Sequence, residues 1–274
     1  MKLYLSVDME GISGFADMQF VDSSKRHYAR GQSLMTAEVN HVIEEALQIG
    51  GREVVVNDSH SKMNNILIEE LHPEAKLISG DVKPYSMVQG LQEGYDGAFF
   101  IGYHARASQR GVMSHTMIFG VRTMFINDHE IGEMGFNAYV AGHYGVPVLL
   151  VTGDDETAKE AEALIPYVTT AIVKEQQSRS AALCLSPQKA KELLQQKTKE
   201  ALHNRAKVKP LTPPDKPLLQ IEFTNYGQAE WAALMPGAKI DEGTTTVRYQ
   251  AKDILEAYQA MLVMTELAMR TDFC

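Results

Sequence analysis

The sequence predicts an α/β fold with a mainly parallel central sheet, flanking helices and a smaller C-terminal α+β lobe. Over most of the chain, short apolar runs alternate with segments of helical periodicity, a pattern typical of βαβ units. After about residue 180 a helical segment, a proline-rich stretch, further apolar runs and a last helix follow. We therefore expect a first unit over residues 1–180 and a C-terminal lobe over 181–274, which together could pack as one domain.

The elements of the first unit follow from the spacing of apolar residues. Residues 32–48 carry apolar side chains at helical intervals, and the two glycines at 50–51 end that helix. Asp154 or Asp155 can cap a later helix, and Pro166 ends it. We expect strands at 3–7, 53–56, 76–79, 98–101, 116–119, 122–126 and 147–151, and helices at 32–48, 64–71, 133–144 and 155–165.

The C-terminal lobe is expected to open with a helix. Ser186 is a good N-cap residue and Pro187 fits the first helical position, so this helix should run to about residue 203. Four prolines between residues 207 and 217 predict an extended connector. Beyond it, the sequence predicts strands at 218–223 and 244–249 and a final helix at 254–269.

Composition and charge argue against several kinds of partner. The chain has 274 residues, of which 45% are hydrophobic and 22% charged, as in ordinary globular proteins. A net charge of −9 without a basic run argues against nucleic acids and anionic membranes as partners. The two isolated cysteines, Cys184 and Cys274, and the lack of a signal-peptide pattern or long apolar stretch predict a cytoplasmic protein with free thiols.

Acidic residues and histidines follow the ends of three predicted strands. Asp8 and Glu10 lie just beyond the first, Asp58 and His60 follow the second, and His104 follows the third. Side chains two residues apart in an extended chain point the same way. Because ligands bind beyond the carboxyl ends of parallel strands, these side chains should meet in one crevice if the strands are neighbours.

This residue set predicts a metal site. Glu133, at the start of a predicted helix, can join Asp8 and Glu10, and three carboxylates this close resist ionising together unless cations compensate them. Mixed histidine and carboxylate ligands suit zinc, manganese or cobalt, and a two-metal site favours hydrolysis. His115 is the expected acid–base group, and Asp58 could accept a hydrogen bond from a ligand imidazole.

Each residue also has a structural interpretation. Asp8 alone is typical of a turn, and His104 or His115 alone could satisfy a buried carbonyl. An acid at position 133 stabilises a helix start, which is the stronger interpretation for Glu133 on spacing alone. These explanations do not account for the arrangement repeated at the strand ends. Motifs for dinucleotide binding, P-loops, HExxH metallopeptidases and nucleophile-elbow hydrolases do not occur in the sequence.

The segments around these residues closely resemble one known family, the zinc-dependent D-aminopeptidases of the bacterial dipeptide-transport operon. The similarity covers the whole chain. It rests on Ser-Val-Asp-Met-Glu-Gly at 6–11, Asn-Asp-Ser-His-Ser-Lys-Met-Asn at 57–64, Gly-Tyr-His-Ala-Arg at 102–106, Met-Ser-His at 113–115, Gly-Glu at 132–133 and Asn-Tyr-Gly-Gln-Ala-Glu-Trp at 225–231.

The resemblance implies a site with two zinc ions, in which Asp8 bridges both ions. The implied ligands are Asp8, Glu10, His60, His104 and Glu133. His115 is implied as the catalytic residue, as a nucleophile or as an acid–base group beside an attacking metal-bound hydroxide. The implied reaction is hydrolysis of short peptides with an N-terminal D-amino acid, such as D-Ala-D-Ala, by a homodecameric ring.

Two other readings remain open at this point. The same ligands could serve a two-metal amidase or phosphoester hydrolase, since such sites share their ligand types. The crevice could also bind a metal or a cationic ligand without turnover. Lys62 and Arg106 lie close to ligands in the sequence and could contact a substrate carboxylate, although exposed surface roles are the simpler interpretation.

Overall fold

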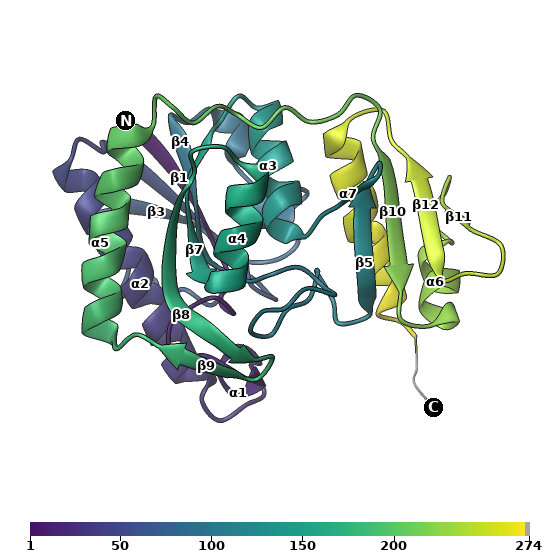
Figure 1. Cartoon of the computed structure of the whole chain (residues 1–274), viewed down its shortest axis with the longest axis horizontal. Coiled ribbons are helices and arrows are strands. Elements are labelled where there is room, and N and C mark those ends of the chain that lie inside the picture. The colour runs from purple at the N-terminus through teal and green to yellow at the C-terminus, as the bar shows by residue number, and fades with distance from the viewer. Residues whose placement is uncertain (272–274) are drawn as a thin grey trace.

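The computed structural model describes residues 1–271 and contains two sheets, which confirms the predicted α/β fold with a mainly parallel sheet (Figure 1). The first sheet has the order β3-β2-β1-β4-β7-β8-β9, parallel except for the β8–β9 pair. Its strands are β1 (Lys2–Val7), β2 (Glu53–Asp58), β3 (Ala75–Ile78), β4 (Gly97–Tyr103), β7 (Val148–Asp154), β8 (Thr169–Ser178) and β9 (Ala181–Cys184).

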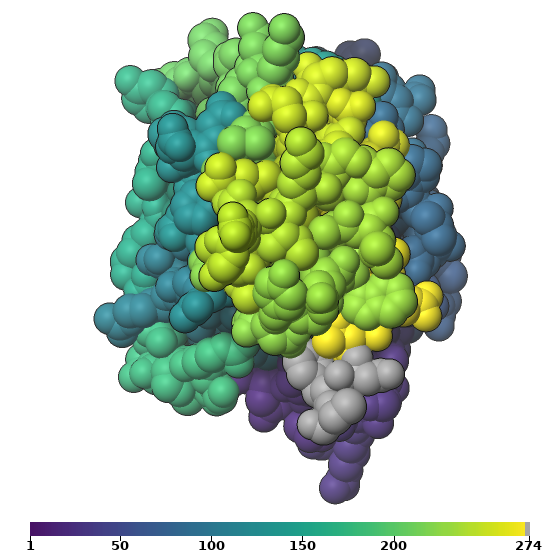
Figure 2. All heavy atoms as spheres, turned by 90° about the vertical axis from the view of Figure 1, so that its right-hand side faces the viewer, coloured from purple at the N-terminus to yellow at the C-terminus, as the bar shows by residue number. Residues whose placement is uncertain are grey.

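The second sheet is antiparallel, with the order β11-β12-β10-β5-β6. Its strands are β5 (Val121–Ile126), β6 (His129–Glu130), β10 (Leu218–Phe223), β11 (Lys239–Ile240) and β12 (Thr246–Gln250). Segments about a hundred residues apart therefore pair directly, as β5 does with β10. The end of the molecule that carries this sheet faces the viewer in Figure 2 and is built mainly from the C-terminal third of the chain.

Helices cover both faces of the first sheet: α2 and α5 lie on one side, and α3 and α4 on the other (Figure 1). Helices α6 and α7 pack on the second sheet, and α7 also contacts α3, which joins the two layers. The helices are α1 (Met18–Val21), α2 (Tyr28–Gln48), α3 (Glu133–His143), α4 (Asp155–Leu164), α5 (Pro187–Asn204), α6 (Tyr226–Ala232) and α7 (Ile254–Ala268), with short 3₁₀ turns η1 (Ser86–Val88) and η2 (Leu91–Glu93).

The caps and most elements lie where the sequence predicts them. The Asp154 side chain caps α4, and the Ser186 side chain caps α5, with Pro187 in its first turn. The two sheets do not follow the expected division at residue 180, because β5 and β6 precede it and α5 packs on α2 and β8. Whether residues 1–180 and 181–274 are separate folding units stays a prediction.

Two predicted elements are wrong. Residues 64–71 form turns instead of a helix, because the Ile66 N–H donates to Asp58 and the Leu67 N–H donates to Thr36. Residues 116–119 form only an isolated bridge, because the Met117 N–H donates to the Glu133 carboxylate. Strands β6, β8, β9 and β11 and helices α1 and α6 are absent from the sequence prediction.

Two glycines allow the chain after β1 to pack against the end of β4. The Asp8 N–H donates to the Ile101 carbonyl at 2.8 Å, and the Gly11 N–H donates to the Gly102 carbonyl at 2.7 Å. A Cβ atom on Gly11 would lie 2.0 Å from the Tyr103 oxygen. Gly102 has φ +70°, and a Cβ there would lie 2.3 Å from the Asp8 oxygen. Side chains at these positions would therefore separate the two segments.

In the described part of the chain, residues 1–271, no helix combines the length and apolar character needed to cross a membrane. Cys184 is a half-buried free thiol, as expected. Cys274 lies outside the described residues.

Candidate metal centre

The candidate site lies at the carboxyl ends of three neighbouring strands. Strand β1 lies between β2 and β4, so the chain that leaves each strand enters the same crevice. Asp8 directly follows β1, His60 lies two residues beyond β2, and His104 directly follows β4. Glu133 comes from the first turn of α3. The structure thus brings the five side chains named as candidate ligands into one place.

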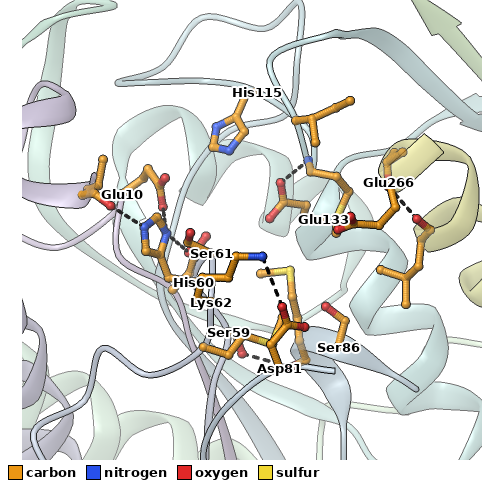
Figure 3. A pocket seen from close by; sticks show the side chains of 18 of the residues that line it. Glu10, Ser59, His60, Ser61, Lys62, Asp81, Ser86, His115, Glu133 and Glu266 are labelled. Atoms are coloured by element: carbon orange, nitrogen blue, oxygen red, sulfur yellow. Dashed lines mark hydrogen bonds and ion pairs between the residues drawn. The ribbon is translucent and has the colours of Figure 1, made fainter. Parts of the chain in front are cut away.

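Asp8 lies between two histidine–carboxylate clusters. On one side, His60 Nδ1 is 3.3 Å from Asp8 Oδ1 and 3.0 Å from Glu10 Oε2. On the other, His104 Nε2 is 3.4 Å from Asp8 Oδ2 and 3.5 Å from Glu133 Oε2. All five side chains are buried. Figure 3 shows Glu10 and His60 on one side of the pocket and Glu133 on the other.

Backbone carbonyls fix the tautomer of both histidines. His60 Nε2 lies 2.7 Å from the Val21 carbonyl, and His104 Nδ1 lies 3.0 Å from the Ala105 carbonyl. A carbonyl oxygen only accepts, so each of these ring nitrogens donates its N–H. In the neutral imidazole the other nitrogen then carries a lone pair, and in both residues this lone pair points at carboxylate oxygens. Such an arrangement needs a proton or a cation between the two atoms.

The unsatisfied atoms of the site support a cation. Within residues 1–271, Asp8 Oδ2, Glu10 Oε2 and His104 Nε2 are buried without a hydrogen-bond partner, which is costly unless a metal coordinates them. Burial, followed by the charge of Glu10, raises the pKa of Asp8 to about 7. Burial alone would lower the pKa of His104, but Glu133 and Asp8 outweigh it and raise this pKa well above its usual value.

Both pKa shifts favour a proton on these groups, which is the effect expected where buried carboxylates and imidazoles share a cation position. Ligand atoms of Asp8, Glu10 and His104 lie within 4.8 Å of one another, and so do those of His104, His115 and Glu133. Histidine nitrogen and carboxylate oxygen are the ligand types that zinc accepts. The residues present thus fit a metal centre.

Glu133 is held by the loop that precedes β5. Its Oε1 accepts a hydrogen bond from the Met117 N–H at 2.5 Å, which leaves Oε2 facing His104. Met117 has φ +60°, a backbone conformation that residues with a Cβ seldom adopt. Glu133 is buried, with 7% of the residue exposed, so its place at a helix start does not by itself explain why it is an acid. Sequence spacing alone favours that simpler explanation.

His115 lies beside the candidate ligands in a defined tautomer. Its ring stacks on His104 with centroids 4.1 Å apart, and Phe119 lies against it with centroids 4.7 Å apart. His115 Nδ1 donates to the Met113 carbonyl at 2.9 Å, so Nε2 is the atom that can accept a proton. Burial, followed by the positive charge of His104, lowers the pKa of His115. The lowered pKa favours the neutral ring, in which Nε2 carries the lone pair.

The expected role of Asp58 is wrong. Its Oδ2 accepts hydrogen bonds from the N–H groups of Asn65 and Ile66 at 2.5 and 2.7 Å, and its Oδ1 accepts one from the Asn65 side chain at 2.8 Å. Asp58 thus shapes the loop after β2, while the Val21 carbonyl orients the His60 ring. The sequence could not reveal this, because a backbone carbonyl leaves no residue-type signal.

Of the two basic residues considered as substrate contacts, only Lys62 lines the pocket. Arg106 forms an ion pair with Glu130, and its backbone N–H donates to Glu160. Lys174 was not recognised from the sequence. It is buried in β8, where its ammonium donates to the carbonyls of Glu10, Ile12 and Phe15 and so holds the segment that carries Glu10. In the sequence, Lys174 directly follows the apolar residues 171–173. A charged residue at the end of an apolar run was the available sign of a buried structural role.

A pocket of ≈ 520 Å³ opens next to the candidate ligands. One wall comes from the loops at the strand ends, and another part comes from α7 and its C-terminal end, with Leu262, Thr265, Glu266 and Met269. Figure 3 shows Glu266 across the pocket from Glu10. Residues after position 180 therefore help to enclose the site. Asp8, Glu10, His60 and Glu133 line a space large enough for a small polar molecule.

Comparison with known proteins gives a consistent result. A family profile described as "Peptidase_M55: D-aminopeptidase" matches residues 1–263. A protein named D-aminopeptidase from Bacillus subtilis (strain 168) is 69% identical over 274 residues, 100% of both chains. A solved structure described as the Zn-dependent D-aminopeptidase DppA from Bacillus subtilis, a self-compartmentalizing protease, matches with a TM-score of 0.99 at 69% identity, and the match covers 100% of both chains. This chain therefore belongs to the D-aminopeptidase family of peptidases, M55.

Proposed function

We propose that this chain hydrolyses the N-terminal peptide bond of short peptides that begin with a D-amino acid, such as D-Ala-D-Ala, and uses two zinc ions per subunit. Family membership supports the peptidase activity, and the description of the Bacillus subtilis relative as zinc-dependent supports the metal. One observation carries the proposal for the site. The lone pairs of His60 Nδ1 and His104 Nε2 face buried carboxylates on opposite sides of Asp8.

The proposed ligands divide into two sets that share Asp8. His60 and Glu10 would hold one cation together with Asp8 Oδ1, and His104 and Glu133 would hold the other together with Asp8 Oδ2. Bound zinc would act as a Lewis acid that polarises the scissile carbonyl and activates water at neutral pH. The chain's own contribution is to fix the donor atoms. The Val21 and Ala105 carbonyls hold the two rings in place.

His115 is the proposed proton carrier. The Met113 carbonyl holds its Nδ1–H, so Nε2 can take a proton from water and return it to the leaving amine. Its lowered pKa keeps the accepting form populated at neutral pH. Because His115 also lies within reach of the ligand atoms of His104 and Glu133, a ligand role is the competing assignment.

Assembly and location are also proposed. The structurally matched relative is described as self-compartmentalizing, which supports a homo-oligomer for this chain, and we expect the decameric ring. Exposed apolar side chains in the C-terminal lobe, such as Leu234 at 66% exposure, offer surface for contacts between subunits. The free Cys184 thiol is compatible with the cytoplasmic location expected from the sequence.

The proposal is tested with purified protein, elemental analysis and a small substrate panel. Zinc should approach two per subunit, a chelator should abolish hydrolysis of D-Ala-D-Ala, added zinc should restore it, and L-Ala-L-Ala should be a poor substrate. Turnover that survives complete removal of metal would contradict the proposal. Faster turnover of a simple amide or a phosphoester than of D-Ala-D-Ala would favour the two-metal amidase or phosphoesterase instead.

His115 is tested separately with His115→Ala, and His129→Ala, an exposed residue of β6, serves as the matched control. Loss of an acid–base group should lower kcat by roughly 10²- to 10⁴-fold. Zinc content should stay the same. Loss of about one zinc per subunit in the His115→Ala variant would instead assign His115 as a ligand.

A further inference from the structure

The pocket beside the candidate metal centre is acidic. Besides the carboxylates already described, its lining includes Asp22, Asp81 and Glu266. A short peptide substrate brings an ammonium at one end and a carboxylate at the other. An acidic pocket suits the ammonium but repels the carboxylate, so a cation is needed where that end binds.

Two lysines line this pocket, and only one of them has an available ammonium. Lys83 is buried, and its Nζ donates to Asn57 Oδ1 at 2.7 Å and to the Asp58 carbonyl at 2.5 Å. The Lys62 side chain is 73% exposed, and its Nζ lies 3.3 Å from Asp81 Oδ2. Figure 3 shows Lys62 extending into the pocket between His60 and Asp81.

The loop that carries Lys62 has an unusual backbone. Ser61 and Met63, on either side of Lys62, have φ +50° and +54°. The turn is held by the Met63 N–H, which donates to the His60 carbonyl at 2.7 Å, and by the Ser79 hydroxyl, which donates to the Met63 carbonyl at 3.1 Å. Left-handed conformations of such residues persist only where surrounding contacts impose them, and they cluster at ligand sites. The same loop therefore positions a candidate metal ligand and the lysine two residues later.

We propose that Lys62 binds the C-terminal carboxylate of the substrate and so favours free-acid peptides over amidated ones. This inference rests on the proposed peptidase function. In a dipeptide the carboxylate lies one residue beyond the scissile carbonyl, roughly 3.5 Å along an extended chain.

Breaking the ion pair between Lys62 and Asp81 costs little free energy. Asp81 is 42% exposed, and ion pairs between exposed side chains contribute little to stability. A substrate carboxylate bound in the pocket can therefore replace Asp81 on the Lys62 ammonium. Asp81 would keep the lysine oriented when no substrate is present.

The experiment compares kcat and KM for D-Ala-D-Ala and its C-terminal amide. The variants are Lys62→Gln, Lys62→Arg and the control Lys76→Gln, whose side chain is also 73% exposed and pairs with Glu53 Oε1 at 3.0 Å. The wild type should prefer the free acid by roughly tenfold in kcat/KM, mainly through KM. Lys62→Gln should remove this preference by raising KM for the acid alone, while Lys62→Arg and Lys76→Gln should retain it.

Asp81→Asn gives an independent measurement, because it removes the carboxylate that competes for Lys62. KM for the free acid should fall while the constants for the amide stay unchanged. Equal cleavage of acid and amide by the wild type, or an equal loss on both substrates in Lys62→Gln, would overturn the assignment and leave the peptidase function standing. A wild-type enzyme that cleaves neither peptide would instead overturn the proposed function, and with it this inference.

Discussion

Replacing Gly102 by alanine is expected to destabilise the protein and weaken the metal centre together. Gly102 has φ +70°, and this left-handed conformation costs an L residue about 1–2 kcal/mol. The added Cβ would also lie 2.3 Å from the Asp8 carbonyl oxygen, a backbone atom that cannot move without moving Asp8. Overpacking of this kind typically costs a further ~1–3 kcal/mol. The expected loss of unfolding free energy is thus about 2–5 kcal/mol.

Gly145→Ala is a matched control for the cost of placing an L residue in the left-handed backbone conformation. Gly145 has φ +71°, but a Cβ there would meet nothing within 4 Å, so only the conformational cost applies. The assay is denaturant unfolding of both variants together with zinc per subunit. Gly102→Ala should lose more stability than Gly145→Ala by ~1–3 kcal/mol and should bind zinc at least tenfold more weakly, because Asp8 is displaced. Equal stability of the two variants with full zinc occupancy would refute the reasoning.

Two further predictions concern pH. Zinc affinity, measured by chelator competition at pH 6, 7 and 8, should weaken as pH falls through about 7. Burial and Glu10 raise the pKa of Asp8 to about 7, so below that pH a proton on Asp8 competes with the metal. A zinc affinity that is the same at all three pH values would contradict this. Glu38 accepts the Ser13 N–H at 2.9 Å, and burial raises its pKa from 4.5 to about 7. The folded state therefore holds this proton more tightly than the unfolded state, so Glu38 lowers the unfolding free energy as pH rises from about 4.5 to about 7. The unfolding free energy of Glu38→Gln, relative to that of the wild type, should rise by up to about 3 kcal/mol between pH 5 and pH 8. Glu45→Gln on the same helix is the control. If the difference between Glu38→Gln and wild type does not change with pH, Glu38 is not the titrating group.

The sequence was most informative where one local pattern decides the outcome. Apolar periodicity and capping residues located α2, α4, α5 and α7 to within a few residues, apart from the first turn of α2. Predictions from local patterns were wrong where contacts with residues far away in the chain determine the secondary structure. Residues 64–71 have helical spacing, yet their N–H groups donate to Asp58 and Thr36. Strand β8 was missed because its polar residues conceal the strand pattern, and one of them, Lys174, is buried against distant carbonyls.

The sequence predicts that Asp8, Glu10, His60 and His104 lie close together, because side chains just beyond the carboxyl ends of neighbouring parallel strands share one crevice. The tertiary structure alone decided which atoms face one another. The Val21 and Ala105 carbonyls set the histidine tautomers, the Met117 N–H orients Glu133, and α7 closes the pocket from the other sheet. These contacts involve backbone groups or residues far apart in the chain, and such groups have no sequence pattern of their own because every residue carries the same N–H and carbonyl.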